Sequence, residues 1–337
     1  MTAPAQQRTE ILKESHWTAQ RHGRITELCQ EAVASKGSGI RSLSHYSNGI
    51  LDFVVCRTER GPLSSMVAEA GDELQDESLP GSRLLLCTQD LGGILRPLGT
   101  GDLMRTVVAN AGGGLWGGRV KPGEFLAGLT EEAASVEAMD TAMNTLVTRL
   151  RTEVHLLPDE LPGGSPAAAP GHSTEQVCPR VDFGTAAQPG SVDEERLRHL
   201  LQGHLNTTDL QYAAYYRDWT LVCVGDVFDA SELGPRFLNV SVRSRRSAYR
   251  DLSQRLSGHL SRLTDALHLV APPEPGGPPV DRLVLDVQEG AVYVTWTSPS
   301  EFVVGVTLDQ PQVGNADTRL NQLARALGEI TTRQPSR

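Results

Sequence analysis

Three strands follow one another in the stretch RLVLDVQEGAVYVTWTSPSEFVVGVTLD, residues 282–309. Apolar residues alternate with polar ones in each strand, and polar turns at 288–290 and 298–300 separate the strands. Successive side chains of a strand point to opposite faces of a sheet, so this alternation places one face in the core and leaves the other in water. The stretch therefore predicts an antiparallel meander.

A helix is expected on each side of the meander. Residues 245–268 carry an apolar residue at every third or fourth position, which forms one stripe along a helix. The stripe consists of Tyr249, Leu252, Leu256, Leu260, Leu263 and Leu267. The sequence APPEPGGPP (271–279) ends this helix, because proline has no N–H to donate to the helical ladder. After the meander, Asn315 is expected to cap a last helix.

Upstream of these elements, the same half of the chain predicts one more helix and a hairpin. The helix covers 193–205, and the strands of the hairpin cover 210–217 and 219–226, where aromatic and apolar residues are frequent. A third short strand is expected at 237–242. The second half thus reads as helix, two or three strands, helix, three strands, helix.

The first half repeats this order less regularly. It predicts helices at 25–36 and 63–75, and strands at 40–46, 50–57, 83–89, 93–99 and 102–110. Residues 83–86 (RLLL) align with 282–285 (RLVL) at an offset of 199, and Leu51 aligns with Leu221 at an offset of 170. We interpret this as an internal duplication. The alternative is that two common α/β orders arose independently.

The segment 158–192 divides the two halves. It is rich in Pro, Gly, Ala and Ser and has no apolar periodicity, which indicates a linker. A chain of 337 residues has room for two domains of ordinary size. We predict an N-terminal extension (1–24), a first domain (25–157), the linker, a second domain (193–331) and a short tail (332–337). The fold class is α/β of the α+β type, with two similar domains, each a mostly antiparallel sheet flanked by helices in the order α-β-β-(β)-α-β-β-β-α.

A glycine-rich stretch, AGGGLWGGRVKPG (111–123), follows the first meander. It is superficially similar to a phosphate-binding loop, but Arg119 replaces the lysine that would reach the phosphates, and Val120 has no hydroxyl for magnesium. A loop that leads into a helix over 124–157 is therefore expected. At 1.5 Å per residue this helix would be roughly 50 Å long, so its excess length would pack on the other half or on a second chain.

No motif indicates catalysis or a metal site. The pairs His16/His22 and His199/His204 have spacings that do not place two imidazoles on one helical face. A G-x-S-x-G nucleophile motif is absent, and the five cysteines form no C-x-x-C pair, which indicates free thiols. We therefore expect a protein that is no enzyme, with no cofactor and no metal.

Charge and hydropathy exclude further classes. A formal net charge of −10 disfavours nonspecific nucleic-acid binding, which needs Lys and Arg to displace counterions from phosphates. The N-terminus has no apolar signal-peptide core, and nowhere do 18 apolar residues run together, so no membrane partner is expected. With free thiols, this predicts a cytoplasmic protein.

Four arginines gather around the start of the helix predicted over 245–268. They are Arg243, Arg245, Arg246 and Arg250. Cations near a helix N-terminus oppose the helix dipole, so carboxylates of the other half or an acidic partner are expected to compensate them. A solvated helix start is the alternative. We take these four arginines as candidate partner-binding residues.

The predicted order of elements resembles that of the roadblock (dynein light chain) family. The resemblance is best across 193–330, where it is carried by 282–309 and by NADTRLNQLARAL (315–327), and RLLLCTQDLGGILRPLG (83–99) is similar in the first half. It implies that two sheets pair side by side, as an intramolecular pseudo-dimer or a homo-oligomer. It also implies that the middle helices bind small Ras-like GTPases or scaffold larger assemblies. A strand at 237–242 would instead fit type III secretion chaperones and YbjN-like proteins, which have three strands before the middle helix.

Three hypotheses of function follow. The leading one is a non-catalytic interaction protein or regulatory scaffold that binds a protein partner such as a small Ras-like GTPase. The second is a chaperone of the secretion or YbjN-like type that binds a protein client. The third is an enzyme that uses the glycine-rich residues 112–123.

Overall fold

The structure, a computed structural model, describes residues 8–58, 73–169, 177–185 and 192–332. It has two compact units. Unit 1 comprises Met1–Asp90, Met104–Pro162 and Leu260–Glu274, and unit 2 comprises Leu91–Leu103, Gly163–His259 and Pro275–Arg337. Helices and antiparallel strands build both units, which confirms the predicted α+β class.

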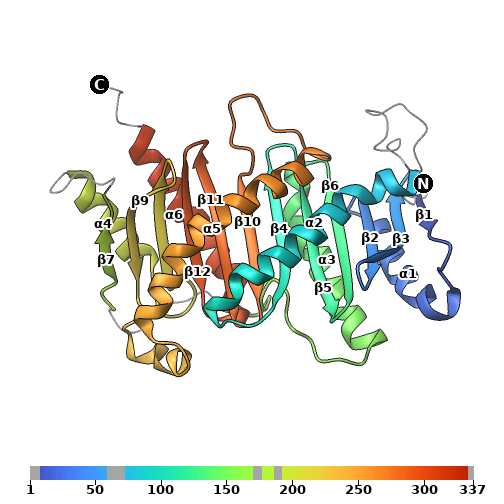
Figure 1. Cartoon of the computed structure of the whole chain (residues 1–337), viewed down its shortest axis with the longest axis horizontal. Coiled ribbons are helices and arrows are strands. Elements are labelled where there is room, and N and C mark those ends of the chain that lie inside the picture. The colour runs from blue at the N-terminus through green and yellow to red at the C-terminus, as the bar shows by residue number, and fades with distance from the viewer. Residues whose placement is uncertain (1–7, 59–72, 170–176, 186–191, 333–337) are drawn as a thin grey trace, which may run out of the picture. The chain divides into compact units, whose positions relative to one another are not determined.

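Unit 1 is built on an antiparallel sheet with the strand order β1-β3-β2-β6-β5-β4. Helices α1 (Ala19–Ala34) and α3 (Val136–Arg149) contact each other and cover one face of this sheet, and α2 (Glu73–Leu95) covers the other (Figure 1). The π-helical turn Leu150–Val154 continues α3. The strands are β1 (Thr9–Lys13), β2 (Ser42–Ser47), β3 (Ile50–Arg57), β4 (Leu103–Asn110), β5 (Gly113–Lys121) and β6 (Glu124–Thr130).

The sheet of unit 2 has the strand order β10-β11-β12-β8-β9-β7. Helices α4 (Val192–His204) and α6 (Val313–Thr332) contact each other on one face, and α5 (Val242–His268) runs along the other (Figure 1). The predicted apolar stripe of α5, from Tyr249 to Leu267, is buried. The strands are β7 (Arg180–Phe183), β8 (Tyr212–Arg217), β9 (Thr220–Asp226), β10 (Arg282–Val287), β11 (Gly290–Ser298) and β12 (Glu301–Thr307).

Strand pairing recurs at matching positions in the two units. Asn110 pairs with Gly113 in unit 1 and Val287 pairs with Gly290 in unit 2, so these registers are offset by 177, the difference between 110 and 287. The hairpins β2–β3 and β8–β9 are each irregular at one point. These irregularities follow His45 and Tyr215, and the difference between 45 and 215 is 170. The hairpin offset used in the sequence alignment therefore matches the strand registers, whereas the meander offset of 199 does not.

The predicted strands at 83–89 and 93–99 are wrong. Residues 73–95 form α2, and the 3-10 turn Arg96–Leu98 follows. The buried residues Leu84, Thr88, Leu91 and Leu95 are spaced by three or four, the spacing of one helix face. A short apolar run such as RLLLC fits a buried strand and a buried helix equally well, which explains the error.

The expected loop at 111–123 and the expected helix over 124–157 are also wrong. The glycine-rich residues form β5, the middle strand of the meander β4–β5–β6, and α3 begins only at Val136. Glycines suit this strand because helices approach it closely. A Cβ on Gly114 would lie 2.9 Å from Val136 Cγ2, and one on Gly117 would lie 3.0 Å from Leu84 Cδ2. Glycine is depleted in strands in general, so composition alone favoured a loop.

Two smaller predictions in the second half are corrected. The expected strand at 237–242 is instead the end of the 3-10 turn Ser231–Phe237, a bend and the first residue of α5. Asn315 is no N-cap, because α6 starts two residues earlier at Val313. The Asn315 amide instead donates to the carbonyl oxygen of Ala168 at 3.1 Å.

Two strands lie where the sequence predicted none. Strand β1 lies in the segment assigned to an N-terminal extension, and β7 lies in the segment assigned to a linker. The expected helix at 63–75 falls largely outside the described residues. In the part of the chain that the structure describes, the helices are either too short or too polar to cross a membrane.

Candidate functional site

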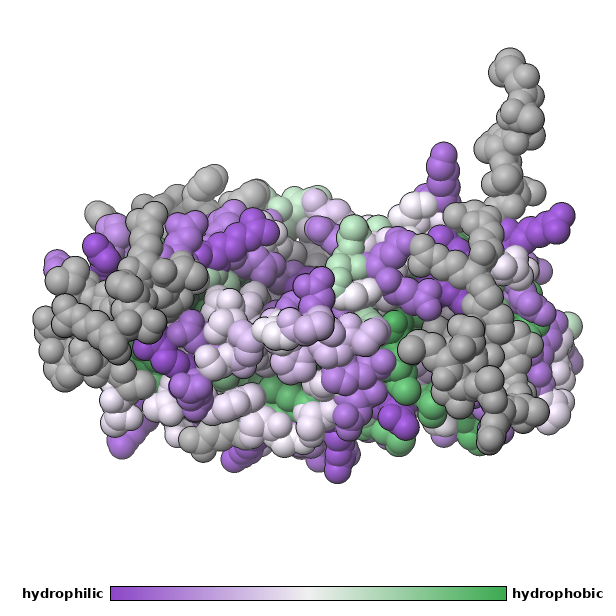
Figure 2. Space-filling model, turned by 90° about the horizontal axis from the view of Figure 1, so that it is seen from above, coloured by the Kyte–Doolittle hydropathy of each residue, from purple (hydrophilic) through white to green (hydrophobic). Residues whose placement is uncertain are grey.

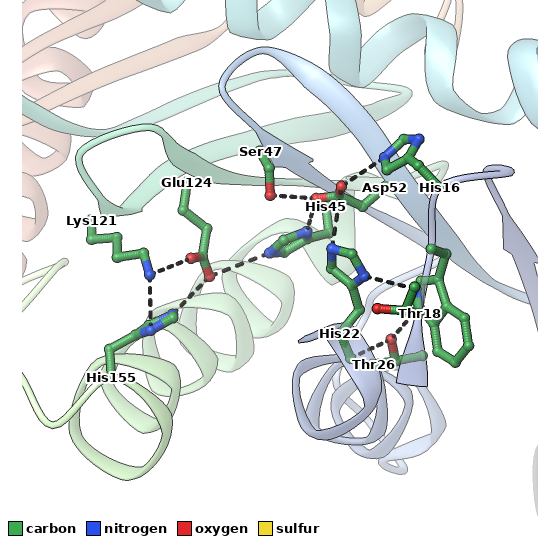
Figure 3. A network of polar contacts seen from close by, with 11 residues as sticks. His16, Thr18, His22, Thr26, His45, Ser47, Asp52, Lys121, Glu124 and His155 are labelled. Atoms are coloured by element: carbon green, nitrogen blue, oxygen red, sulfur yellow. Dashed lines mark hydrogen bonds and ion pairs between the residues drawn. The ribbon is translucent and has the colours of Figure 1, made fainter. Parts of the chain in front are cut away.

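A buried group of polar side chains lies in unit 1, on the neighbouring strands β3, β2 and β6 (Figure 3). His45 comes from β2, Asp52 from β3 and Glu124 from β6. The register of β2 and β3 shifts between His45 and Tyr46, and this irregularity leaves Asp52 without a paired residue on β2. Such irregularities re-aim side chains, and here the Asp52 carboxylate meets the His45 ring.

His45 lies between two carboxylates. Its Nδ1 is 2.8 Å from Asp52 Oδ2 and its Nε2 is 3.3 Å from Glu124 Oε1 (Figure 3). Both nitrogens donate only when the ring is an imidazolium. Burial by itself would lower the pKa of His45, but the hydrogen bonds with Asp52 and Glu124 outweigh burial and raise it. His45 is therefore a buried cation.

The two carboxylates have further donors. Asp52 accepts hydrogen bonds from Ser47 Oγ at 2.6 Å and His16 Nε2 at 2.9 Å. Burial would raise the pKa of Asp52, yet the hydrogen bonds from His45, Ser47 and His16 hold it well below its ordinary range. These hydrogen bonds therefore favour the ionised form of the Asp52 carboxylate.

Glu124 is held in a similar way by His155, which follows the π-helical turn after α3, and by Lys121, the last residue of β5. His155 Nε2 is 2.9 Å from Glu124 Oε1, and Lys121 Nζ is 3.2 Å from Glu124 Oε2. Lys121 also donates to His155 Nδ1 at 3.0 Å, which leaves the proton of that ring on Nε2, facing the carboxylate. Burial would raise the pKa of Glu124, but the hydrogen bonds from His45 and His155 lower it to about 2.

His22 on α1 completes the group from the helix side. Its Nδ1 accepts a hydrogen bond from the Thr18 backbone N–H at 3.1 Å, and its Nε2 lies 3.5 Å from Asp52 Oδ1. Burial lowers the pKa of His22, so this ring is neutral with its proton on Nε2. The described residues include no group of three or more His, Cys, Asp or Glu arranged to hold a metal ion.

The arrangement does not activate a nucleophile. In a Ser-His-Asp triad the imidazole stands between the hydroxyl and the carboxylate. Here the Ser47 hydroxyl donates directly to Asp52, and His45 bridges Asp52 to a second carboxylate. The group therefore joins three strands, α1 and the end of α3 through charged hydrogen bonds, and it makes that junction sensitive to pH.

Unit 2 has a different group at the matching positions. Glu301 is the counterpart of Glu124, since each begins the third strand of its meander, and Arg217 Nε contacts the Glu301 Oε1 at 2.7 Å. Tyr215 takes the place of His45 at the irregular point of its hairpin. An arginine keeps its charge at all relevant pH values, so the pH-sensitive cation is a property of unit 1.

Sequence reasoning missed this group because its histidines were compared only for helical spacing. His16, His22, His45 and His155 come from four different segments and meet around two acids. One signal was available. Asp52 stands inside the apolar strand ILDFVVCR, where an acid is expected only if it is paired.

The four candidate arginines do not form one exposed patch. Arg243 is exposed, whereas Arg245 is buried with its guanidinium 5.5 Å from the Phe237 ring centroid. Arg246 pairs with Asp226 at 2.6 and 2.7 Å. The remaining pairs are Arg246 with Asp229 at 2.6 Å and Arg250 with Asp182 at 2.9 Å. Carboxylates of the same unit therefore compensate Arg246 and Arg250. The role of the four arginines in partner binding stays a prediction.

An exposed apolar face lies on α2. Leu79 and Leu86 are 40% and 64% exposed. They are two helical turns apart, so they lie on the same side of the helix. The face of the molecule seen in Figure 2 is mostly hydrophilic, with small separate hydrophobic areas. Against such a surface, two large apolar side chains on one helix face are a candidate contact for another protein.

The chain was compared with protein-family models, curated proteins and solved structures, and none of these comparisons found a match.

Proposed function

We propose that this chain is a non-catalytic protein-binding protein or scaffold, and that the outward face of α2 contacts its partner. The observation that carries the proposal is the exposure of Leu79 and Leu86 on one face of the middle helix of unit 1. Apolar residues two turns apart are a usual anchor for a helix-mediated protein contact. The partner class that we propose is a small Ras-like GTPase, because the resemblance to roadblock proteins implies binding through the middle helices.

The order of elements supports this proposal over its alternatives. Helix, two strands, helix, three strands, helix occurs along the chain from α1 to α3 and again from α4 to α6. The chaperone alternative depended on a strand at 237–242, and these residues form none. The enzyme alternative depended on a glycine-rich loop, and Gly113–Lys121 is a strand whose glycines pack against helices.

Internal duplication is part of the proposal. A buried ion pair joins Arg105 to Asp140 in unit 1, and Arg282 pairs with Asp317 at the matching positions of the strand register. Gly128 and Gly305 contact Met143 and Leu320, again at positions that match. Two independent folds would have no reason to share an ion pair and a close glycine contact in the same register.

A cytoplasmic location and a paired assembly are further proposals. All five cysteines are free, and four of them are buried, which suits a reducing compartment. Light scattering on the purified chain distinguishes a monomer, in which any pairing of the halves is internal, from a homo-oligomer.

Binding measurements with matched variants test the α2 face. Leu79→Lys/Leu86→Lys adds two charges to the apolar face, and Thr141→Lys/Thr145→Lys adds them at exposed polar positions of α3, on the opposite face of the sheet. Purified small Ras-like GTPases, loaded with GDP or a GTP analogue, are the probes. We expect the leucine variant to bind at least ~10-fold more weakly than the control, since apolar anchors dominate such interfaces.

The same experiment has two contradicting results. If no GTPase binds the wild-type chain, the proposed partner class fails. If partners captured from native lysate are retained equally by both variants, the α2 face fails as the contact.

A further inference from the structure

Strand β1 is the outer strand of the unit 1 sheet, where it pairs with β3 on one side (Figure 1). The Thr58 N–H donates to the carbonyl oxygen of Arg8 at 3.1 Å, and the Glu14 N–H donates to that of Asp52 at 3.0 Å. In an antiparallel pair, residues that form such bonds alternate with residues whose backbone groups point away from the partner strand. The even-numbered residues of the segment 8–14 therefore turn their backbone groups toward β3.

The odd-numbered residues of this segment turn their backbone groups to the free edge of the sheet. They are Thr9, Ile11 and Lys13. In the part of the chain that the structure describes, the N–H and C=O groups of these three residues have no hydrogen-bond partner. Unpaired backbone groups at a sheet edge are a template for a further strand. One more strand can therefore pair with β1 along this edge.

The outer strand of the unit 2 sheet, β7, is protected in a way that β1 is not. The Gly184 N–H donates to the carbonyl oxygen of Val222 at 2.9 Å, so Val181 and Phe183 turn their backbone groups outward. Arg198 of α4 covers this edge, because its Nη1 lies 3.5 Å from the Val181 carbonyl oxygen and its guanidinium lies 5.0 Å from the Phe183 ring centroid. Among the described residues, no side chain donates in this way to the outward carbonyl oxygens of β1.

The charges of the segment 8–14, RTEILKE, select a second copy of the same segment in one register. In a two-fold antiparallel pair, outward residues oppose outward residues, so the axis can pass at residue 10, 11 or 12. With the axis at Ile11, Arg8 of each copy stands opposite Glu14 of the other copy. An axis at residue 10 would oppose Glu10 with Glu10, and an axis at residue 12 would oppose Glu10 with Glu14. Like charges directly opposite each other destabilise a strand pair, so the register at Ile11 is favoured.

The side chains that set this register are available. Arg8 is exposed and Glu14 is half-buried, and neither has an ion-pair partner within the described residues. A pair of opposite charges across two strands stabilises their register, and the two-fold axis makes the pair of Arg8 with Glu14 occur twice.

We propose that two copies of this chain associate by antiparallel pairing of β1 with β1, with the two-fold axis at Ile11. Thr9, Ile11 and Lys13 supply the backbone hydrogen bonds, and the pairs of Arg8 with Glu14 set the register. Such a contact uses the same surface on both copies and closes at two chains. This inference rests on the proposed paired assembly and names the surface that forms it.

A proline on each free edge tests which strand forms the contact. Ile11→Pro removes an outward N–H and leaves the bonds of β1 to β3 in place, and proline is tolerated at such edge positions. We expect it to weaken dimerisation of the full chain at least ~10-fold in sedimentation equilibrium, because each copy loses a hydrogen bond across the axis. Val181→Pro makes the same change on β7 and should leave the dimer intact. Melting temperatures show that both variants fold.

A charge exchange tests the register. Arg8→Glu alone and Glu14→Arg alone each oppose like charges twice, and each should weaken dimerisation at least ~5-fold. The double variant Arg8→Glu/Glu14→Arg restores opposite charges and should recover most of the wild-type affinity. A double variant no better than the single ones would overturn the register at Ile11.

Cross-linking locates the axis. In a Cys178→Ser background, which removes the exposed native thiol, Ile11→Cys places one thiol of each copy at the axis. The Cα atoms of a hydrogen-bonded pair are about 5.5 Å apart, which a disulfide spans, so a covalent dimer should form on oxidation. Lys13→Cys is the control, because four residues along the strands, roughly 13 Å, separate its two copies. Equal cross-linking of both variants would contradict the axis at Ile11.

The remaining outcomes separate this inference from the proposed function. If Ile11→Pro dimerises as wild type does, the β1 edge alone is excluded and the homo-oligomer stands. If Val181→Pro prevents association, or the mass grows beyond two chains, β1 pairs with β7 and the proposal is overturned. If the wild-type chain sediments as a single chain throughout the concentration series, this inference and the homo-oligomer fail together. Binding of GTPases through α2 is then still decided by the Leu79→Lys/Leu86→Lys variant.

Discussion

At His45, both ring nitrogens face carboxylate oxygens, so the folded chain favours the imidazolium form. Its pKa is raised above the ordinary value of 6.5 by the hydrogen bonds with Asp52 and Glu124, which outweigh the opposing effect of burial. The stabilisation from this cation is therefore complete below pH 6.5 and is lost as pH rises through the raised pKa. His22 acts in the opposite direction, because burial lowers its pKa and its contribution is lost as pH falls below 6.5.

His45→Gln should destabilise unit 1 more at pH 6 than at pH 9. At pH 6 the variant leaves the Asp52 and Glu124 carboxylates without their shared cation, at a cost of about 3–5 kcal/mol. At pH 9 part of the wild-type advantage has already been lost, so the difference is smaller. Urea unfolding at both pH values measures it. His199→Gln, at an exposed position, is the control, and a cost that does not depend on pH would contradict the charged state assigned to His45.

At acidic pH, protonation of the Glu124 carboxylate should lower the stability of unit 1. Hydrogen bonds from His45 and His155 lower the pKa of Glu124 to about 2, against an opposing effect of burial. A lowered carboxyl pKa contributes stability above its unfolded value, near 4.5, and this contribution is lost as pH falls toward 2. We expect Glu124→Gln to flatten the stability profile between these values, and thermal melts from pH 5 to pH 2.5 would show it.

Alanine substitutions at two glycines, Gly118 of β5 and Gly93 of α2, should change the stability of the fold in opposite directions. A Cβ on Gly118 would lie 2.1 Å from Trp116 Cη2, so Gly118→Ala forces the buried indole to move and should cost about 1–3 kcal/mol. Gly93, on the exposed side of α2, has no atom within 4 Å of such a Cβ, and Gly93→Ala should stabilise the helix by about 0.5–1 kcal/mol. Thermal unfolding measures both. A Gly118→Ala effect that appears only with a bound nucleotide would revive the glycine-rich loop as a ligand site.

Among whole elements, those with a regular pattern were predictable from the sequence. The meander of unit 2, the hairpins β2–β3 and β8–β9, and α5 all lie close to their expected ranges, because alternation or a helical stripe identifies them without tertiary information. Helix α2 and strand β5 were not predictable in this way. Leu84 and Leu91 of α2 are spaced for a helix but stand in a short apolar run, and the glycines of β5 make sense only once Leu84 and Val136 lie over them.

The start of α5 depends on charges supplied by other elements. Arg246 makes two hydrogen bonds to Asp226, whose side chain is only 5% exposed, and a third to Asp229. Arg246→Ala leaves a nearly buried carboxylate without its cation and should cost about 1.5–3 kcal/mol. Arg243→Ala, at the exposed arginine, should stay within about 0.5 kcal/mol of wild type. The urea concentrations at the unfolding midpoints of the two variants measure this difference. Equal effects would show that the pair of Arg246 with Asp226 contributes nothing to stability.

For the whole molecule, the residues that make up each unit predict whether two separately expressed fragments of the chain associate. Unit 1 includes Leu260–Glu274, where Ala271 accepts a hydrogen bond from the Asn110 side chain at 2.8 Å and Arg262 pairs with Asp90 at 2.6 Å. Fragments 1–162 and 163–337, expressed together with a tag on one, should therefore purify together. Separate elution would contradict the assignment of residues 260–274 to unit 1, and Asn110→Ala with Asp90→Ala should weaken the association.

The interleaved composition of the units also constrains the history of the gene. A duplication that copies a stretch of DNA end to end produces two halves that follow each other, but residues 91–103 and 260–274 belong to units outside their own half. If the halves arose by the duplication that we propose, recombination that replaced one half with unrelated sequence would also remove part of the other unit's core. The two halves would then be inherited and change together, and compensating substitutions should be sought between 91–103 and unit 2 and between 260–274 and unit 1.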